Sequence, residues 1–470
     1  MIKLLANKIT GKQVRNNVVL SVMAQAISLI VSFVINLIVP KFITEQQYSY
    51  WQMYVLYVGY VGVLHLGLLD GLILRNSQYD YDELNKKMMV SQFRTLLSMI
   101  SFFAIIIVFI SSISFEREYK YVAYLVSVGI ITKNLVTYNS YSLQMTNRIN
   151  KYVIMSIVQR LSFGIITVFL LLLKINDFTW YCLAEIIGDS IAIMLGIVYS
   201  KEIFFGKSFS FQDTFVESIK NLTSGFMLLI ANWTSMLLVG GAKIIVQWHW
   251  DDIVFGKVSF AFSLTSLFLT FVNAISIVLF PTLKRLNTEQ LPSLYNRIRN
   301  AISPILLLLM IGYFPGYWIL EKWLPAYTPS LSYLGILLPI IVFSSKVNLL
   351  TNNYMKAYRE EKKMMIINVI SVFAGLALYS LFSFIVNDLY AVLISVVVII
   401  MLSSIVSEII VSKLINQSMT KEFIVECILS VVFIICTQGL SLWIGMVIYS
   451  TVIIAYLYYN KASISSLFRR

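Results

Sequence analysis

Three basic side chains fall inside long apolar stretches of the sequence: Lys133, Lys346 and Arg160. A charge at the centre of a bilayer costs at least ~2.5–3.5 kcal/mol on insertion scales, so each cation needs a partner or a water-filled cavity. Ammonium and guanidinium groups that face such a cavity bind anions, phosphate groups in particular. We therefore expect Lys133 and Lys346, together with Arg160, to form a cationic site for an anionic substrate near the middle of the membrane.

A purely structural role for the same cations has to be weighed against this one. Lys133 and Lys346 could each pair with a carboxylate in their own half of the chain. Arg160 is expected at a depth similar to that of Asp189, which shares a helix face with Glu185. An internal Arg160–Asp189 pair is therefore as good an interpretation as substrate contact, and both carboxylates are also candidates for ion coupling.

Two further lysines, Lys243 and Lys257, lie near the expected outer ends of two spans. Asp251 and Asp252 are close to both of them in the sequence. The lysines could form part of an outer gate, or they could be ordinary surface charges paired with these aspartates.

Two buried acids, Asp70 and Glu408, lie near the expected cytosolic ends of their spans. We expect them to reach toward the interface, or to pair with Arg75 and Lys413. A role in ion coupling is the alternative.

Other reactive residue types are sparse, and no group has the spacing of a metal site or a cofactor site. We expect His65 and the three cysteines (Cys182, Cys427 and Cys436) to serve packing. Trp233, beside Asn232, is a weak candidate for a surface on which a sugar could stack.

The elements that position these residues are membrane-spanning helices. Of 470 residues, 59% are hydrophobic and 13% are charged, against ~25% charged in soluble domains. Apolar stretches run from 17–39 to 424–459, and the last one splits near Gln438. At ~20 residues per span, we expect an all-α polytopic membrane protein with about 14 transmembrane helices.

Charge and tryptophan positions predict the orientation of these spans. If the N-terminus is cytosolic and the spans alternate, most of the 36 Lys and Arg residues lie on the cytosolic side, as the positive-inside rule requires. Every tryptophan except Trp233 then falls at an outer end. The net charge of +13 therefore reflects the membrane topology and does not indicate a nucleic-acid partner. Both termini are expected in the cytosol.

Two similar segments, residues 134–139 and 348–353, indicate an internal repeat. The sequences are NLVTYN and NLLTNN, each closely follows an intramembrane lysine, and each precedes a basic turn. Six spans separate the copies, so the repeats run parallel. We expect two pseudo-symmetric six-helix lobes with a substrate path between them and two extra helices. The expected boundaries are 1–200 for the first lobe, 201–221 for a cytosolic amphipathic linker, 222–412 for the second lobe and 413–470 for the extra helices and a basic tail.

The layout as a whole resembles a known family. A short basic N-terminus leads to a first span that ends at Pro40, the stretch Gly67–Gly71 precedes Arg75, and basic turns follow spans 4 and 10. This arrangement is similar to bacterial polysaccharide-biosynthesis flippases of the Wzx type, in the multidrug/oligosaccharidyl-lipid/polysaccharide exporter superfamily. The resemblance implies alternating-access transfer of an undecaprenyl-pyrophosphate-linked oligosaccharide to the outer leaflet of the inner membrane, for O-antigen or capsule assembly.

We expect a monomer, because two lobes already form a closed path, and we do not expect an enzyme, because no polar segment is long enough for a catalytic domain outside the bilayer. The lipid bilayer and glycan polymerase machinery are the expected partners. Relatives that carry a peptidoglycan lipid look similar at this level. A cation-coupled multidrug exporter of the same superfamily is the alternative, although central lysines would repel cationic drugs. A membrane glycan polymerase is a weaker alternative, because such enzymes are expected to have a large outer loop and the outer loops here are short.

Overall fold

The computed structural model describes residues 12–283, 291–417 and 420–459, and every regular element in these ranges is a helix. An apolar chain in a bilayer must satisfy its backbone hydrogen bonds within each segment, which favours helices. The expected all-α class is therefore confirmed.

Contacts between Cα atoms divide the chain into two compact units. The N-terminal unit covers 11–236 and the C-terminal unit covers mainly 237–470. The dividing point lies inside a helix, whereas a linker was expected over 201–221. The boundaries expected at 200, 222 and 412 stay predictions.

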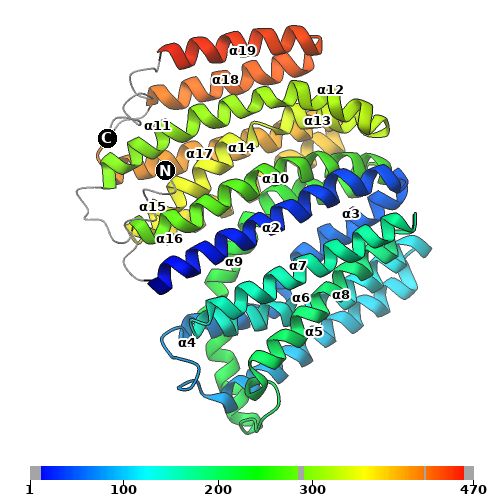
Figure 1. Cartoon of the computed structure of the whole chain (residues 1–470), viewed down its shortest axis with the longest axis vertical. Coiled ribbons are helices and arrows are strands. Elements are labelled where there is room, and N and C mark those ends of the chain that lie inside the picture. Colours follow the sequence, from blue (N-terminus) through cyan, green and yellow to red (C-terminus); the bar gives the residue numbers. More distant parts are fainter. Residues whose placement is uncertain (1–11, 284–290, 418–419, 460–470) are drawn as a thin grey trace. The chain divides into compact units, whose positions relative to one another are not determined.

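The N-terminal unit consists of the following elements: α2 (Lys12–Phe42), α3 (Glu45–Tyr60), η1 (Val61–His65), α4 (Leu68–Asn76), α5 (Lys86–Ser114), α6 (Arg117–Met145), α7 (Ile149–Leu172), α8 (Phe178–Tyr199), η2 (Lys201–Ile203) and the first part of α9 (Phe211–His249). Within this unit α7 packs against α2 and α8, and α6 packs against α5 and α8 (Figure 1).

The C-terminal unit consists of the end of α9 and the following elements: α10 (Asp252–Leu283), α11 (Leu291–Leu309), η4 (Met310–Gly312), α12 (Tyr313–Trp323), η5 (Pro325–Tyr327), α13 (Thr328–Leu337), α14 (Ile340–Lys346), η6 (Val347–Thr351), α15 (Asn352–Ala357), α16 (Glu361–Ser380), η7 (Leu381–Val386), α17 (Leu389–Leu414), α18 (Thr420–Gln438) and α19 (Leu442–Tyr459). Here α16 packs along α17, α13 contacts α10, α17 and α18, and α18 pairs with α19.

Length and apolarity identify the chain as a multi-span membrane protein. Among the described residues, nine helices are long and apolar enough to cross a membrane, and twelve spans result if each of three bent helix pairs counts as one. The expected number of fourteen is not confirmed. The helices α6 and α18 are outside the set, and they carry Lys133 and Glu426, two charged residues described below.

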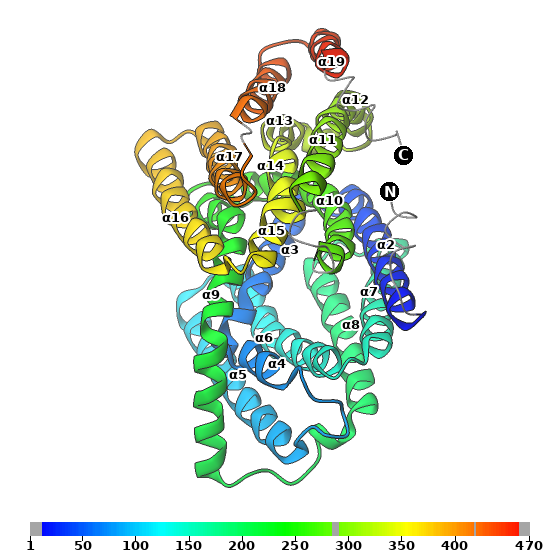
Figure 2. The ribbon, with the colours of Figure 1, turned by 90° about the vertical axis from the view of Figure 1, so that its left-hand side faces the viewer.

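One of the bent pairs, α3–η1 followed by α4, turns by 59°. Leu66 and Gly67 at the bend have φ of 51° and 88°, in the left-handed region that favours glycine. Beyond the bend, α4 packs very closely on α9, since a Cβ on Gly71 would lie 1.8 Å from the carbonyl oxygen of Asn221. Figure 2 shows the first half of α9 beside α4 and α5.

In each unit a tyrosine hydroxyl bonds to the backbone of a neighbouring helix, while the expected repeat stays a prediction. The Tyr138 hydroxyl on α6 donates to the carbonyl of Met89 near the start of α5. The Tyr354 hydroxyl on α15 donates to the carbonyl of Leu291 at the start of α11. In each unit the fourth span is thus tied to the cytosolic end expected for the third.

The tryptophans expected at outer ends of spans differ in exposure. Trp51 is only 2% exposed and packs edge-on against Tyr48 near the start of α3. Trp180, Trp248 and Trp443 are 50–69% exposed.

Candidate functional site

Lys133 on α6 is held by two carboxylates of α8. Its ammonium lies 2.6 Å from Glu185 Oε1 and 2.9 Å from Asp189 Oδ2. Glu185 and Asp189 are one helical turn apart, so they share the α8 face that meets α6. We call these three residues the N-terminal charge network.

Two neutral side chains complete the environment of Asp189. Gln159 on α7 donates to Asp189 Oδ1 at 2.6 Å, and the Thr132 hydroxyl donates to Oδ2 at 3.3 Å. The Asp189 side chain is 1% exposed, whereas Glu185 and Lys133 are 16% and 24% exposed. One ammonium faces two carboxylates, so with all three groups ionised the network has a net charge of −1.

A larger cluster lies in the C-terminal unit. Lys346 on α14 lies 2.7 Å from Glu408 Oε1 on α17 and also pairs with Glu426 on α18. Arg299 on α11 contacts both carboxylates at 3.4 Å. We call these four residues the C-terminal charge network.

Two cations and two anions make this network neutral, and its four side chains are at most 4% exposed. A buried ion pair is tolerable only when each charge is matched by a partner and by hydrogen bonds. The four members come from four helices, so the network fastens α18 to the rest of the unit. Arg299 and Glu426 were missed by sequence reasoning, because both lie at the expected ends of spans, where charges are common.

This geometry corrects the expectation of a site with free cations at Lys133 and Lys346. Each lysine is neutralised by carboxylates of its own unit, which is the alternative weighed above. Lys346 is also closed off from solvent, at 2% side-chain exposure. Lys133 retains partial exposure, in a setting that is net negative.

Arg160 does not form the expected pair with Asp189. It lies on α7 next to Gln159, and Gln159 takes the inward position beside the carboxylate. The Arg160 side chain is exposed, and no carboxylate lies within ion-pair distance of it in the described part of the chain. Among the three expected intramembrane cations, Arg160 has the most exposed side chain.

Lys243 and Lys257 are both half-buried. The Lys243 ammonium lies 5.9 Å from the centre of the Phe255 ring, a weak cation–π distance. No carboxylate is within ion-pair distance of Lys243 among residues 12–283, 291–417 and 420–459, so the expected pairing with Asp251 or Asp252 is wrong for this lysine.

The two acids near the cytosolic ends have partners other than those expected. Asp70 is 2% exposed and lies 3.8 Å from His65 Nε2, and the expected partner Arg75 pairs with Glu217 at 2.7 Å. Arg75 also donates to Asn221. Both contacts belong to the close packing of α4 on α9, which pulls Arg75 away from Asp70.

Glu408 pairs with Lys346 and Arg299 in place of Lys413. Lys413 is one residue from the end of α17, and it is exposed. The interior cations are the nearer partners because Glu408 lies on the buried face of α17.

No metal site stands out in the described ranges, where no three His, Cys, Asp or Glu side chains converge. Cys182 and Cys436 are buried and Cys427 is half-buried, and all three are free thiols.

Comparison with known proteins identifies relatives. Residues 14–287, more than half of the chain, match the family model described as polysaccharide biosynthesis protein. No curated protein matches the sequence at a significant level.

Solved structures of transporters share the fold. A structure of the lipid II flippase MurJ in an inward closed conformation is 15% identical, with a TM-score of 0.70, and the match covers 96% of this chain and 100% of that one. An inward-facing multidrug-resistance MATE transporter of the MOP superfamily is 11% identical, with a TM-score of 0.62 and coverage of 83% and 94%. A MOP-superfamily transporter from Pyrococcus furiosus is 12% identical, with a TM-score of 0.51 and coverage of 86% and 96%.

Proposed function

The chain belongs to the polysaccharide biosynthesis protein family, and from this premise we propose that it is a flippase for a lipid-linked oligosaccharide. It moves an undecaprenyl-pyrophosphate-linked glycan from the cytosolic to the outer leaflet of the bacterial inner membrane by alternating access. The product feeds the assembly of a surface polysaccharide such as O-antigen or capsule. The observation that carries the proposal is the family match over 14–287, and the fold shared with a lipid II flippase supports it.

The proposed working form is a monomer with both termini in the cytosol. Glycan polymerase machinery receives the flipped product on the outer side. No catalytic step and no cofactor is assigned to this chain, because flipping a lipid breaks no covalent bond.

Arg160 is the proposed contact for the anionic headgroup in the N-terminal unit, and Lys243 is a separate candidate contact for an anionic group in the C-terminal unit. Each lacks a carboxylate partner within the described residues, so each positive charge is available to a phosphate oxygen. Lys133 is assigned a secondary role, because its partial exposure lets it approach the same headgroup while Glu185 and Asp189 hold it. We assign Lys346 to stability.

One observation favours a second function, a cation-coupled exporter. The N-terminal charge network has one carboxylate more than its lysine can neutralise, and Glu185 is partly exposed. A surplus carboxylate can hold a proton or a small cation. A flippase that couples transport to an ion would also have this surplus carboxylate. Identifying the transported substrate is therefore what distinguishes the flippase from the exporter.

A reconstitution experiment tests the proposed function directly. The purified protein is placed in vesicles that carry a fluorescent undecaprenyl-pyrophosphate oligosaccharide in one leaflet, and a membrane-impermeant quencher reports movement to the other leaflet. We expect protein-dependent movement of the lipid. Retention of the lipid in its original leaflet, with transport of a cationic dye by the same vesicles, would show that the exporter is the correct assignment.

Charge-removing variants test the headgroup contacts in the same assay. We expect Arg160→Gln to slow flipping at least tenfold, since it removes a phosphate-binding charge. Arg117→Gln is a matched control, because Arg117 is an exposed arginine at the start of α6 in the same unit. Lys243→Gln is compared with Lys356→Gln, which removes an exposed lysine on α15.

A further inference from the structure

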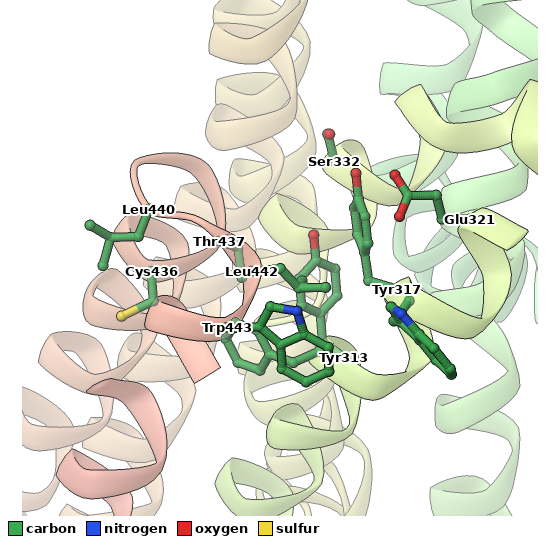
Figure 3. Close-up of a pocket in the computed structure, with 11 residues that line it drawn as sticks. Tyr313, Tyr317, Glu321, Ser332, Cys436, Thr437, Leu440, Leu442 and Trp443 are labelled. Carbon is green, nitrogen blue, oxygen red and sulfur yellow. The ribbon is translucent and has the colours of Figure 1, made fainter. Parts of the chain in front are cut away.

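A pocket of about 360 Å³ lies within the C-terminal unit, between α12–α13 and α18–α19. Its lining includes five aromatic side chains, Tyr313, Phe314, Tyr317, Trp318 and Trp443. Figure 3 shows that the side chains come from both helix pairs, with Cys436 and Leu440 on the α18 side and Tyr317 and Glu321 on the α12 side. The volume falls within the ~300–1,000 Å³ typical of small-molecule sites.

The floor of this aromatic pocket is ordered by packing. Tyr313 is 6% exposed, its hydroxyl donates to the Leu331 carbonyl at 3.1 Å, and its ring meets Phe433 edge-on at 5.7 Å. The helices around the floor approach closely, because a Cβ on Gly445 of α19 would lie 2.3 Å from the Cys436 carbonyl oxygen of α18. Close packing of α18 on α19 and the contacts of Tyr313 therefore form the base of the pocket.

The rim combines exposed rings with hydrogen-bonding groups. Trp318 and Trp443 are 43% and 53% exposed. The Glu321 carboxylate and the hydroxyls of Tyr317 and Ser332 are near the opening, and Tyr317 and Ser332 form a hydrogen bond. Flat apolar surfaces beside a few hydroxyl and carboxylate groups suit a ligand that has both apolar faces and many hydroxyls.

We propose that the aromatic pocket binds an uncharged pyranose unit of a saccharide. The C–H face of the sugar would lie against the Trp443 ring, and Glu321 would accept hydrogen bonds from its hydroxyls. Trp318 and Trp443 are expected at outer ends of spans, so the site would receive sugars on the outer side of the membrane. This proposal rests on the proposed function, and it names a place where the flipped glycan is held before release.

An ammonium headgroup of a phospholipid is the competing ligand, since aromatic rings beside a carboxylate also attract cations. Two observations favour the sugar. The ring of Trp318 already has a cation of the chain, the Lys322 ammonium, 3.9 Å from its centre. The polar groups of the lining are mostly neutral, with two serine or threonine hydroxyls and two tyrosines against one carboxylate.

The test uses the full-length protein purified in a detergent whose headgroup contains no sugar. Tryptophan fluorescence and saturation-transfer NMR are recorded while cellobiose, maltose or chitobiose is added. We expect at least one disaccharide to bind saturably, with transfer strongest to its ring C–H protons. Trp443→Ala should weaken this binding at least tenfold and Glu321→Gln several-fold. Trp180→Ala, which removes a tryptophan of similar exposure outside the pocket (50% against 53% for Trp443), should leave it unchanged.

Three results would overturn the proposal: no saturable binding of any of the disaccharides, binding that Trp443→Ala and Glu321→Gln leave intact, or displacement of the sugar by glycerophosphoethanolamine at lower concentration. The vesicle assay on the same preparation separates the two ideas. Flipping without disaccharide binding would refute the sugar site and support the flippase function. Disaccharide binding without flipping would support the sugar site and refute the flippase function.

Discussion

The Lys346 ammonium lies 2.7 Å from Glu408 Oε1, and the two side chains are 2% and 0% exposed. Removing one member of a buried pair leaves an uncompensated charge and costs about 3–5 kcal/mol. Lys346→Met should therefore lower the unfolding temperature and the yield of folded protein, measured by thermal unfolding in detergent.

Because the C-terminal charge network is neutral, a second substitution that restores neutrality should recover part of the stability lost in Lys346→Met. Lys346→Met combined with Glu408→Gln leaves Arg299 with Glu426, which is again a neutral pair. The double variant should be more stable than Lys346→Met alone, and Lys356→Met, at an exposed position, should resemble the unmodified protein. Equal stability of the single and double variants would contradict a role for charge balance.

The two carboxylates of the N-terminal charge network should differ in their contribution to stability. Asp189 is 1% exposed and has three side-chain partners, whereas Glu185 is 16% exposed. Glu185→Gln leaves a neutral Lys133–Asp189 pair, so we expect a change within about 1 kcal/mol. Asp189→Asn should cost roughly 3 kcal/mol, since it removes the buried partner of the lysine. Thermal unfolding of the two variants side by side checks the order, and the reverse order would refute this account.

The close approach of α4 to α9 leads to a third prediction. A Cβ on Gly71 would lie 1.8 Å from a backbone oxygen, so Gly71→Ala must push the helices apart. Overpacking of this kind costs ~1–3 kcal/mol, and more where backbone is the obstacle. We expect a clear loss of folded protein by size-exclusion chromatography. Gly59→Ala is the control, because nothing lies within 4 Å of its added Cβ.

The fold class could be predicted from composition because a bilayer admits so few structures. Runs of apolar residues predict helices, and two short matching segments predict the repeat. The apolar stretches at 121–143 and 424–459 predicted helices where α6 and α18 lie, but neither helix is among the candidate spans of the described residues, because each also carries charged and polar residues. The number of spans is therefore the least predictable feature.

The candidate site was less predictable, because depth in the membrane does not determine which way a side chain points. Arg160 and Gln159 are neighbours on α7, yet only Gln159 faces Asp189. Sequence spacing identified Lys133 and Lys346 as intramembrane charges and left their partners open. The partners of Lys346 come from helices far apart in the sequence, and no local pattern specifies such contacts.

The last prediction concerns the energy source for flipping. Outward movement of an anion from a negative interior is downhill by ~2.3 kcal/mol per charge per 100 mV. A potassium diffusion potential across the reconstituted vesicles should therefore speed transfer of the pyrophosphate lipid toward the positive side and slow it when the sign is reversed. Vesicles without protein control for leakage of the probe. A rate that ignores the potential would mean that the protein moves a compensating cation with the lipid, and Glu185 and Asp189 would then be the first residues to replace.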